Sequence, residues 1–125
     1  MLEEILVAVD DRPGLLAEVG EVLGSARVNI ETLSVATFSG KGTIRLVVDD
    51  GEEAAEVLKK NGFDVLHSRP VIAVTLDDRP GELGRYCRKL ADSGVSVSAV
   101  YLARRDAGET ELIFSVDKPE TASQL

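Results

Sequence analysis

A five-residue sequence that occurs twice constrains the fold of this chain more than any other feature. Residues 10–14 read DDRPG, and residues 77–81 repeat these letters 67 positions later (77 − 10). An apolar run precedes each copy, and apolar residues at helical spacing follow each copy. This self-similarity predicts two copies of one small fold. We therefore expect two units, residues 1–69 and residues 70–125.

Charge and composition limit the partners. The chain has 125 residues, of which 22 are acidic and 14 basic, so its formal net charge is −8. This excess disfavours binding to nucleic acids and to anionic membranes, which need a basic patch. Cys87 is the single cysteine, so no intrachain disulfide forms, and the start of the chain lacks the features of a signal peptide. We expect a cytoplasmic location and neither nucleic acid nor membrane as a partner.

The first unit begins with a strand and a helix. Residues 5–10 form a short apolar run that predicts a strand, and the DDRPG turn ends it. Proline suits the first helical position, so we expect the helix to start at Pro13 or Gly14. Its predicted apolar stripe is Leu16, Val19, Gly20, Leu23 and Ala26. A glycine on that stripe indicates a close approach to a sheet.

Two hairpins occupy matching places in the two units. The apolar alternation changes phase near residues 31–32 and again near residues 98–99, which predicts a β-bulge in each unit. Residues 39–42 and 105–108 are the expected turns. The offset between the copies grows to 68 after the second bulge region (112 − 44), so we expect the second hairpin loop to be one residue longer.

The remaining elements complete a known order. Glu52 and Glu53 open a second helix, Gly62 is its expected C-terminal cap, and residues 63–67 form a last strand. Residues 68–70 are the predicted linker. The first unit thus has the β-α-β-β-α-β order of ferredoxin-like folds, an α+β class with helices on one face of an antiparallel sheet. The second unit stops after a short helix expected at Pro119, so it lacks the last strand and leaves an open sheet edge.

These residues resemble the ACT domain family of small regulatory modules. The family pattern is a strand, an Asp-x-Pro-Gly turn, a helix with leucine soon after the glycine, and a second strand that often opens with Asn-Ile. Residues 11–16 (DRPGLL) and 29–30 (NI) carry this pattern in the first unit, and residues 78–83 (DRPGEL) and 96–97 (SV) carry it less fully in the second. The chain resembles stand-alone tandem ACT proteins that have no enzyme domain.

The resemblance implies an amino-acid site where two ACT units meet, formed by the turn of one unit and the second strand of the other. A helix start offers free N–H groups and a positive dipole end, which suit a carboxylate. The amide of Asn29 can both donate and accept. The implied amino-acid-binding residues are Asp11, Arg12, Pro13, Gly14, Leu15, Leu16, Asn29 and Ile30. Asp11 has an alternative interpretation, in which it caps the helix and binds no ligand.

The second turn implies a second, weaker site. Its residues are Asp78, Arg79, Pro80, Gly81, Ser96 and Val97. Ser96 stands in the place of Asn29 and lacks the two-sided hydrogen bonding of an amide. Binding is therefore expected to be asymmetric.

The sequence contains no recognisable catalytic or metal-binding constellation. His67 is the only histidine, and it is expected at a surface or strand edge. We expect no enzyme activity, no cofactor and no metal. The predicted function is a non-enzymatic sensor of an amino acid, acting as a homo-oligomer, with a dimer expected. The alternative is an interaction module without a ligand, which the open sheet edge favours.

Overall fold

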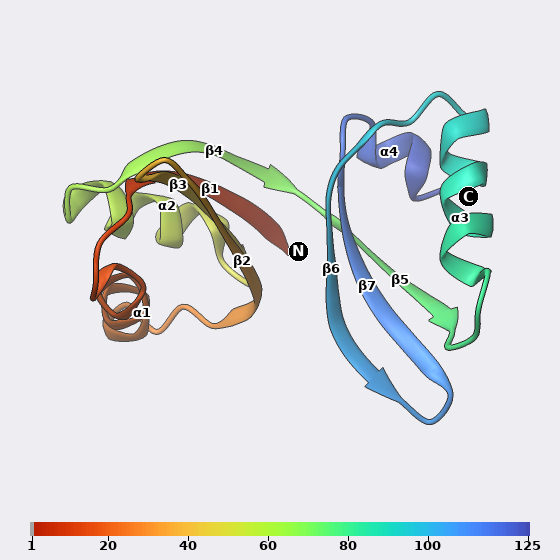
Figure 1. Ribbon diagram of the computed structural model, residues 1–125, viewed down its shortest axis with the longest axis horizontal. Coiled ribbons are helices and arrows are strands. Elements are labelled where there is room, and N and C mark those ends of the chain that lie inside the picture. The colour runs from red at the N-terminus through yellow and green to blue at the C-terminus, as the bar shows by residue number, and fades with distance from the viewer. Residues whose placement is uncertain (1) are drawn as a thin grey trace. The chain divides into compact units, whose positions relative to one another are not determined.

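A computed structural model describes residues 2–125, and the chain divides into two compact units, Met1–Pro70 and Val71–Leu125. The first unit contains β1 (Glu3–Asp10), α1 (Leu15–Ser25), β2 (Ile30–Phe38), β3 (Lys41–Val48), α2 (Gly51–Lys60) and β4 (Asp64–Pro70) (Figure 1). The second contains β5 (Ile72–Asp77), α3 (Glu82–Asp92), β6 (Val97–Asp106), β7 (Glu109–Val116) and α4 (Pro119–Ala122). Both units are α+β.

The first unit has the predicted ferredoxin-like arrangement. Its sheet has the strand order β2-β3-β1-β4, and all neighbouring strands are antiparallel. Because side chains alternate along a strand, Ile5 and Val7 of β1 share a face with their partners Leu46 and Ile44 of β3. Helices α1 and α2 cover this face (Figure 1), and all four of these side chains are fully buried.

The second unit repeats the arrangement without the last strand, as predicted. Its sheet has the order β5-β7-β6, and its core forms around Leu90 and Phe114. The rings of Tyr86 and Phe114 meet edge to face with centroids 5.2 Å apart. Burial raises the pKa of the Tyr86 hydroxyl. The short helix α4 starts at Pro119, as expected, and β5 has no further strand beside it among residues 2–125.

The start and the buried side of α1 differ from the prediction. The helix begins at Leu15, and Gly14 is its N-cap with φ of 86° in the left-handed region. Gly20 is exposed, and a Cβ built on it would meet no atom within 4 Å, so the predicted close approach to a sheet is wrong. Leu16 is 46% exposed. The stripe that faces the core follows partly buried Leu15 and buried Val19 and Leu23, which keep a regular four-residue spacing.

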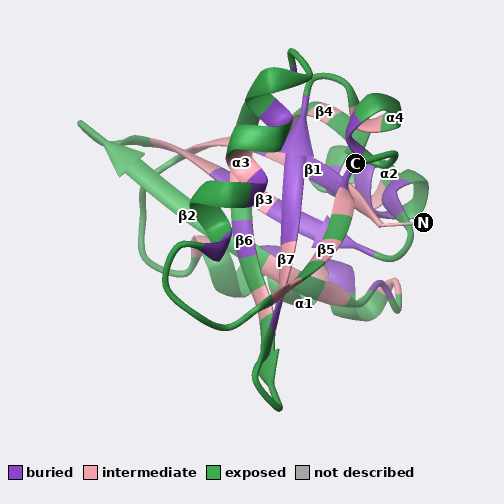
Figure 2. Cartoon of the chain, turned by 90° about the vertical axis from the view of Figure 1, so that its right-hand side faces the viewer, coloured by how far each residue is buried: buried purple, intermediate pink, exposed green. Residues whose placement is uncertain are grey.

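Both predicted bulges are present, but the predicted loop difference is wrong. The pairing shifts between Ile30 and Thr32 in β2, and between Val97 and Ala99 in β6. Each hairpin loop has two residues with positive φ, Ser39-Gly40 and Ala107-Gly108, which is the type I′ turn that matches strand twist. The extra residue of the second unit lies in a further bulge between Leu102 and Arg104. The β6–β7 tip and most of β2 are exposed (Figure 2).

The predicted linker is part of a strand. Ser68, Arg69 and Pro70 pair with Ile5, Glu4 and Glu3 of β1, so residues 68–70 extend β4. Proline is tolerated there because β4 is an edge strand and Pro70 is its last residue. Only Val71 separates β4 from β5. None of the helices within residues 2–125 is long and apolar enough to cross a membrane.

Candidate functional site

The first DDRPG turn joins the end of β1 to the start of α1. The backbone N–H of Asp11 donates to the carbonyl oxygen of Gly40 at 2.8 Å, which ties the turn to the β2–β3 hairpin. Gly14 then reverses the chain with a φ of 86°, a conformation that costs other residues free energy. Glycine is therefore the favoured residue at this N-cap, which sets the backbone at the start of α1.

No side chain caps the start of α1. The N–H of Leu15 lies 3.4 Å from the Arg12 carbonyl oxygen, and the N–H of Glu18 bonds to Gly14. Between them, the N–H groups of Leu16 and Ala17 have no acceptor within residues 2–125. The alternative role of Asp11 as a helix cap is therefore wrong.

Helix α2 shows what a capped start looks like in the same unit. There Asp50 is the N-cap, and its carboxylate accepts a hydrogen bond from the N–H of Glu53 at 3.1 Å. An aspartate precedes both helices, but only in α2 does its carboxylate cap the helix. Helix α1 keeps its positive end open to an external anion, whereas α2 does not.

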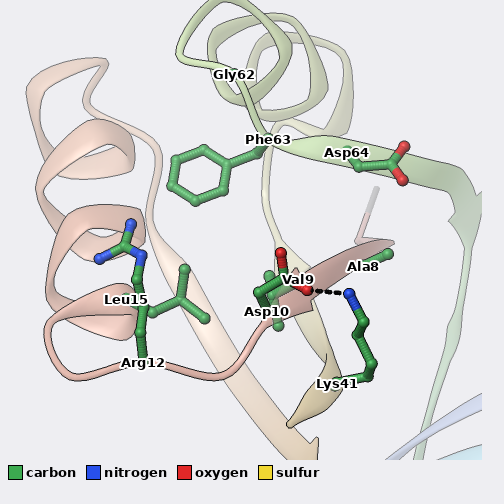
Figure 3. Close-up of a pocket in the computed structure, with 10 residues that line it drawn as sticks. Ala8, Val9, Asp10, Arg12, Leu15, Lys41, Gly62, Phe63 and Asp64 are labelled. Atoms are coloured by element: carbon green, nitrogen blue, oxygen red, sulfur yellow. Dashed lines mark hydrogen bonds and ion pairs between the residues drawn. The ribbon is translucent and has the colours of Figure 1, made fainter.

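A cavity of about 460 Å³ adjoins the first turn (Figure 3). Four segments line it: the end of β1, the turn with the start of α1, the start of β3, and the loop before β4. Leu15 and Phe63 give it apolar surface, and the Phe63 ring projects from its loop toward α1. The cavity is large enough for a small metabolite.

Charges of both signs surround this cavity. Lys41 Nζ lies 2.5 Å from Asp10 Oδ1, and this hydrogen bond lowers the pKa of the Asp10 carboxyl. Arg12 forms an ion pair with Glu18, and the carboxylate raises the pKa of the guanidinium. Asp64 also lines the cavity. Exposed groups of both signs therefore lie next to the apolar surface of Leu15 and Phe63.

Asn29 and Ile30 lie at the opposite end of the sheet from this turn. Ile30 pairs with Val48, which pairs with Glu3, whereas Asp10 at the other end of β1 pairs with Lys41. The seven residue steps from Glu3 to Asp10 span about 23 Å. The implied site residues of one unit therefore do not come together within that unit.

Asn29 already has partners inside its own unit. Its backbone N–H donates to Asp49 Oδ1 at 3.2 Å, and its Nδ2 donates to Glu31 Oε1 at 3.1 Å. The matching backbone N–H of Ser96 donates to Asp117 Oδ1 at 2.9 Å. The shared backbone bond positions the start of β2 and of β6. Because the Asn29 side chain donates through Nδ2, its amide oxygen remains available as an acceptor.

The second turn has the same backbone but different chemistry. Gly81 is the N-cap of α3 with φ of 91°, and no side chain caps that helix. Arg79 lies 3.4 Å from Asp77 and 3.1 Å from Glu82. Arg105 lies 3.0 Å from Asp78. A smaller cavity of about 220 Å³ adjoins this turn, while Ser96 and Val97 lie at the far end of their sheet.

Sequence reasoning missed Lys41, Phe63 and Asp64 as cavity residues. They follow the first turn by 27 positions or more (41 − 14), and only the fold brings them beside it. The hairpin register could have indicated Lys41, because it sets the first residue of β3 opposite Asp10. No sequence signal indicated Phe63.

His67 is a hydrogen-bonding residue of the first sheet. Its Nε2 lies 3.1 Å from Glu4 Oε1, and Arg45 Nη1 lies 3.1 Å from the same oxygen. No group of three or more His, Cys, Asp or Glu side chains suited to a metal ion occurs among the described residues.

Comparison with known protein families shows to which family this chain belongs. A family model described as an ACT domain pair matches residues 1–125. The chain belongs to the ACT domain pair family. Among curated proteins, none matches it.

Solved structures with a similar fold agree with the observed architecture. A protein from Bacteroides thetaiotaomicron is 23% identical with a TM-score of 0.83, over 98% of this chain and 83% of that one. The ligand-free regulatory subunit of aspartate kinase from Thermus thermophilus is 17% identical with a TM-score of 0.74, over 98% and 88% of the two chains. At these identities the likeness concerns the fold.

Proposed function

We propose that this ACT pair is a non-enzymatic regulatory protein that binds an amino acid at the first DDRPG turn. The ligand's carboxylate would take the free N–H groups of Leu16 and Ala17, and its side chain would enter the cavity beside Leu15 and Phe63. One observation carries the proposal: the start of α1 has uncapped amides, and Arg12 and Leu15 of the same segment line a cavity of about 460 Å³.

The proposed site is completed by a second ACT unit. Because Asn29 lies about 23 Å from the turn of its own unit along the sheet, the Asn29 and Ile30 that complete a site would come from a different unit. This follows the family pattern, in which a turn and a second strand from two units meet. A homodimer is the assembly we propose for this arrangement, and the cytoplasmic location stays a prediction.

The similar structures support a regulatory role. One of them is a regulatory subunit of aspartate kinase, an enzyme that acts on an amino acid. We propose that ligand binding favours one arrangement of ACT units over another, and that a partner protein responds to this change. Such a ligand shifts the equilibrium only by its difference in affinity for the two states.

Thermal melts with each of the twenty amino acids test the proposal. A ligand at one hundred times its dissociation constant adds about 2.7 kcal/mol to the free energy of unfolding. For a chain of this size the melting temperature should rise by about 5 °C or more. The absence of a shift with every amino acid at millimolar concentration would contradict the proposed function.

A second candidate is an interaction module without a ligand. The observation that favours it is the outer edge of β5, where no strand pairs among residues 2–125. An unpaired edge offers backbone N–H and C=O groups to another chain. Sedimentation velocity that shows only monomer across a wide range of concentrations would contradict this candidate.

A further inference from the structure

The first residue of the helix differs between the two turns. Leu15 opens α1, and Glu82 opens α3 at the equivalent position 67 residues later (82 − 15). The turn sequence before both residues is identical, and both N-cap glycines have left-handed backbones, with φ of 86° and 91°. The replacement therefore changes the chemistry of the helix start without changing its backbone.

Two arginines hold the carboxylate of Glu82 in place. Arg79 Nε lies 3.1 Å from Oε1, and Arg85 Nη2 lies 2.5 Å from Oε2. The Glu82 side chain is only 11% exposed, and its hydrogen bond to Arg85 is the main cause of the lowered pKa of its carboxyl. Glu82 is therefore ionised at neutral pH.

The first unit has its glutamate at a different position of the first helical turn. Glu18 occupies the place of Arg85 (85 − 18 = 67), and Arg12 forms its ion pair with this glutamate. Leu15 has no charged group, so the first residue of α1 presents an apolar side chain to the cavity that Arg12 also lines. The cavity of about 220 Å³ at the second turn is a different one, because β6 and β7 line it through Leu102, Arg105 and Leu112, whereas the loop before β4 lines the cavity at the first turn.

We propose that Glu82 excludes an amino-acid carboxylate from the second turn, so that each chain binds one amino acid, at the first turn. The inference rests on the proposed function. A carboxylate in the first turn of a helix already interacts favourably with the positive end of the helix dipole. A ligand carboxylate at the same helix start would meet the like charge of Glu82, whose two arginine partners are already engaged.

The test introduces a carboxylate at position 15 of the first turn, the counterpart of Glu82 in the second. Leu15→Glu places a carboxylate beside Arg12, and Leu15→Gln is the matched control, with the same size and no charge. The twenty amino acids are tested one at a time by thermal melting of the full chain, and those that shift the melt are titrated by calorimetry. We expect one site per wild-type chain. Both variants lose the apolar contact of Leu15, so the comparison is between them: Leu15→Glu should bind at least about tenfold more weakly than Leu15→Gln, because a like charge at the site costs more than 1.4 kcal/mol.

Each outcome decides between the two proposals. Two sites per wild-type chain, or equal affinity of the Leu15→Glu and Leu15→Gln variants, would overturn the role of Glu82 and leave the proposed function standing. No binding of any amino acid by the wild-type chain would overturn the proposed function itself. The wild-type stoichiometry keeps the inference testable even if a substitution at position 15 prevents folding, which melts without ligand would show.

Discussion

At the residue scale, the glycine of each DDRPG turn has a conformational role that the sequence only partly revealed. The sequence indicated that the helix starts at Pro13 or Gly14. The structure adds that Gly14 and Gly81 are left-handed N-caps, so a side chain there is strained even though a Cβ on either glycine would meet no atom within 4 Å.

Gly14→Ala should therefore lower the free energy of unfolding by about 1–2 kcal/mol, the cost of a left-handed residue with a Cβ. Gly20→Ala is the matched control, because a Cβ at Gly20 also meets nothing within 4 Å and its backbone is helical. This control should raise the same quantity by about 0.5–1 kcal/mol. Urea unfolding of both variants measures the two effects. Equal effects in both variants would contradict the left-handed assignment.

The carboxyl of Glu82 gives a second prediction at this scale. Its pKa lies below its ordinary value of 4.5, chiefly because of Arg85 and then Arg79. Because the folded pKa is the lower one, the stabilising contribution is complete above pH 4.5 and is lost as the pH falls through the folded pKa. Arg85→Gln should raise the Glu82 pKa more than Arg79→Gln does, in carboxyl carbon-13 titrations. A larger effect of Arg79→Gln would show that the ion pair is assigned wrongly.

At the element scale, the sequence predicted the order of strands and helices and both bulges, because apolar alternation reports directly on faces and register. It failed where the answer depends on long-range pairing. Residues 68–70 look like a linker, and only their pairing with β1 makes them a strand. The extra residue of the second hairpin lies in a bulge of β6 and not in the loop, because a two-residue type I′ turn matches strand twist better than a longer loop.

Helix capping gives a prediction at the scale of elements. Asp50→Ala should lower the free energy of unfolding by about 1 kcal/mol, because the carboxylate of Asp50 caps α2. Asp11→Ala is the control at the other helix, where the aspartate caps nothing, and it should change the same quantity by less than about 0.5 kcal/mol. Chemical denaturation compares the two. A loss at Asp11 as large as the loss at Asp50 would mean that Asp11 stabilises the turn in another way.

At the scale of the whole molecule, the duplicated turn predicted the family and the fold, and each unit has its own buried core. The candidate site was only partly predictable. The turn and its glycine are local features, whereas Lys41 and Phe63 reach the cavity through strand pairing and the loop before β4. Asn29 was predicted from family resemblance, and its place about 23 Å along the sheet from the turn explains why one unit alone cannot complete the proposed site.

The central claim is that the open amides of α1 receive the ligand's carboxylate. Amide nitrogen-15 and proton spectra of the full chain, recorded while an amino acid that raises the melting temperature is added, test it most directly. The account predicts that the largest shift changes fall on Leu16 and Ala17, while the equivalent amides of Leu83 and Gly84 change little. Saturable binding that leaves Leu16 and Ala17 unchanged would contradict it.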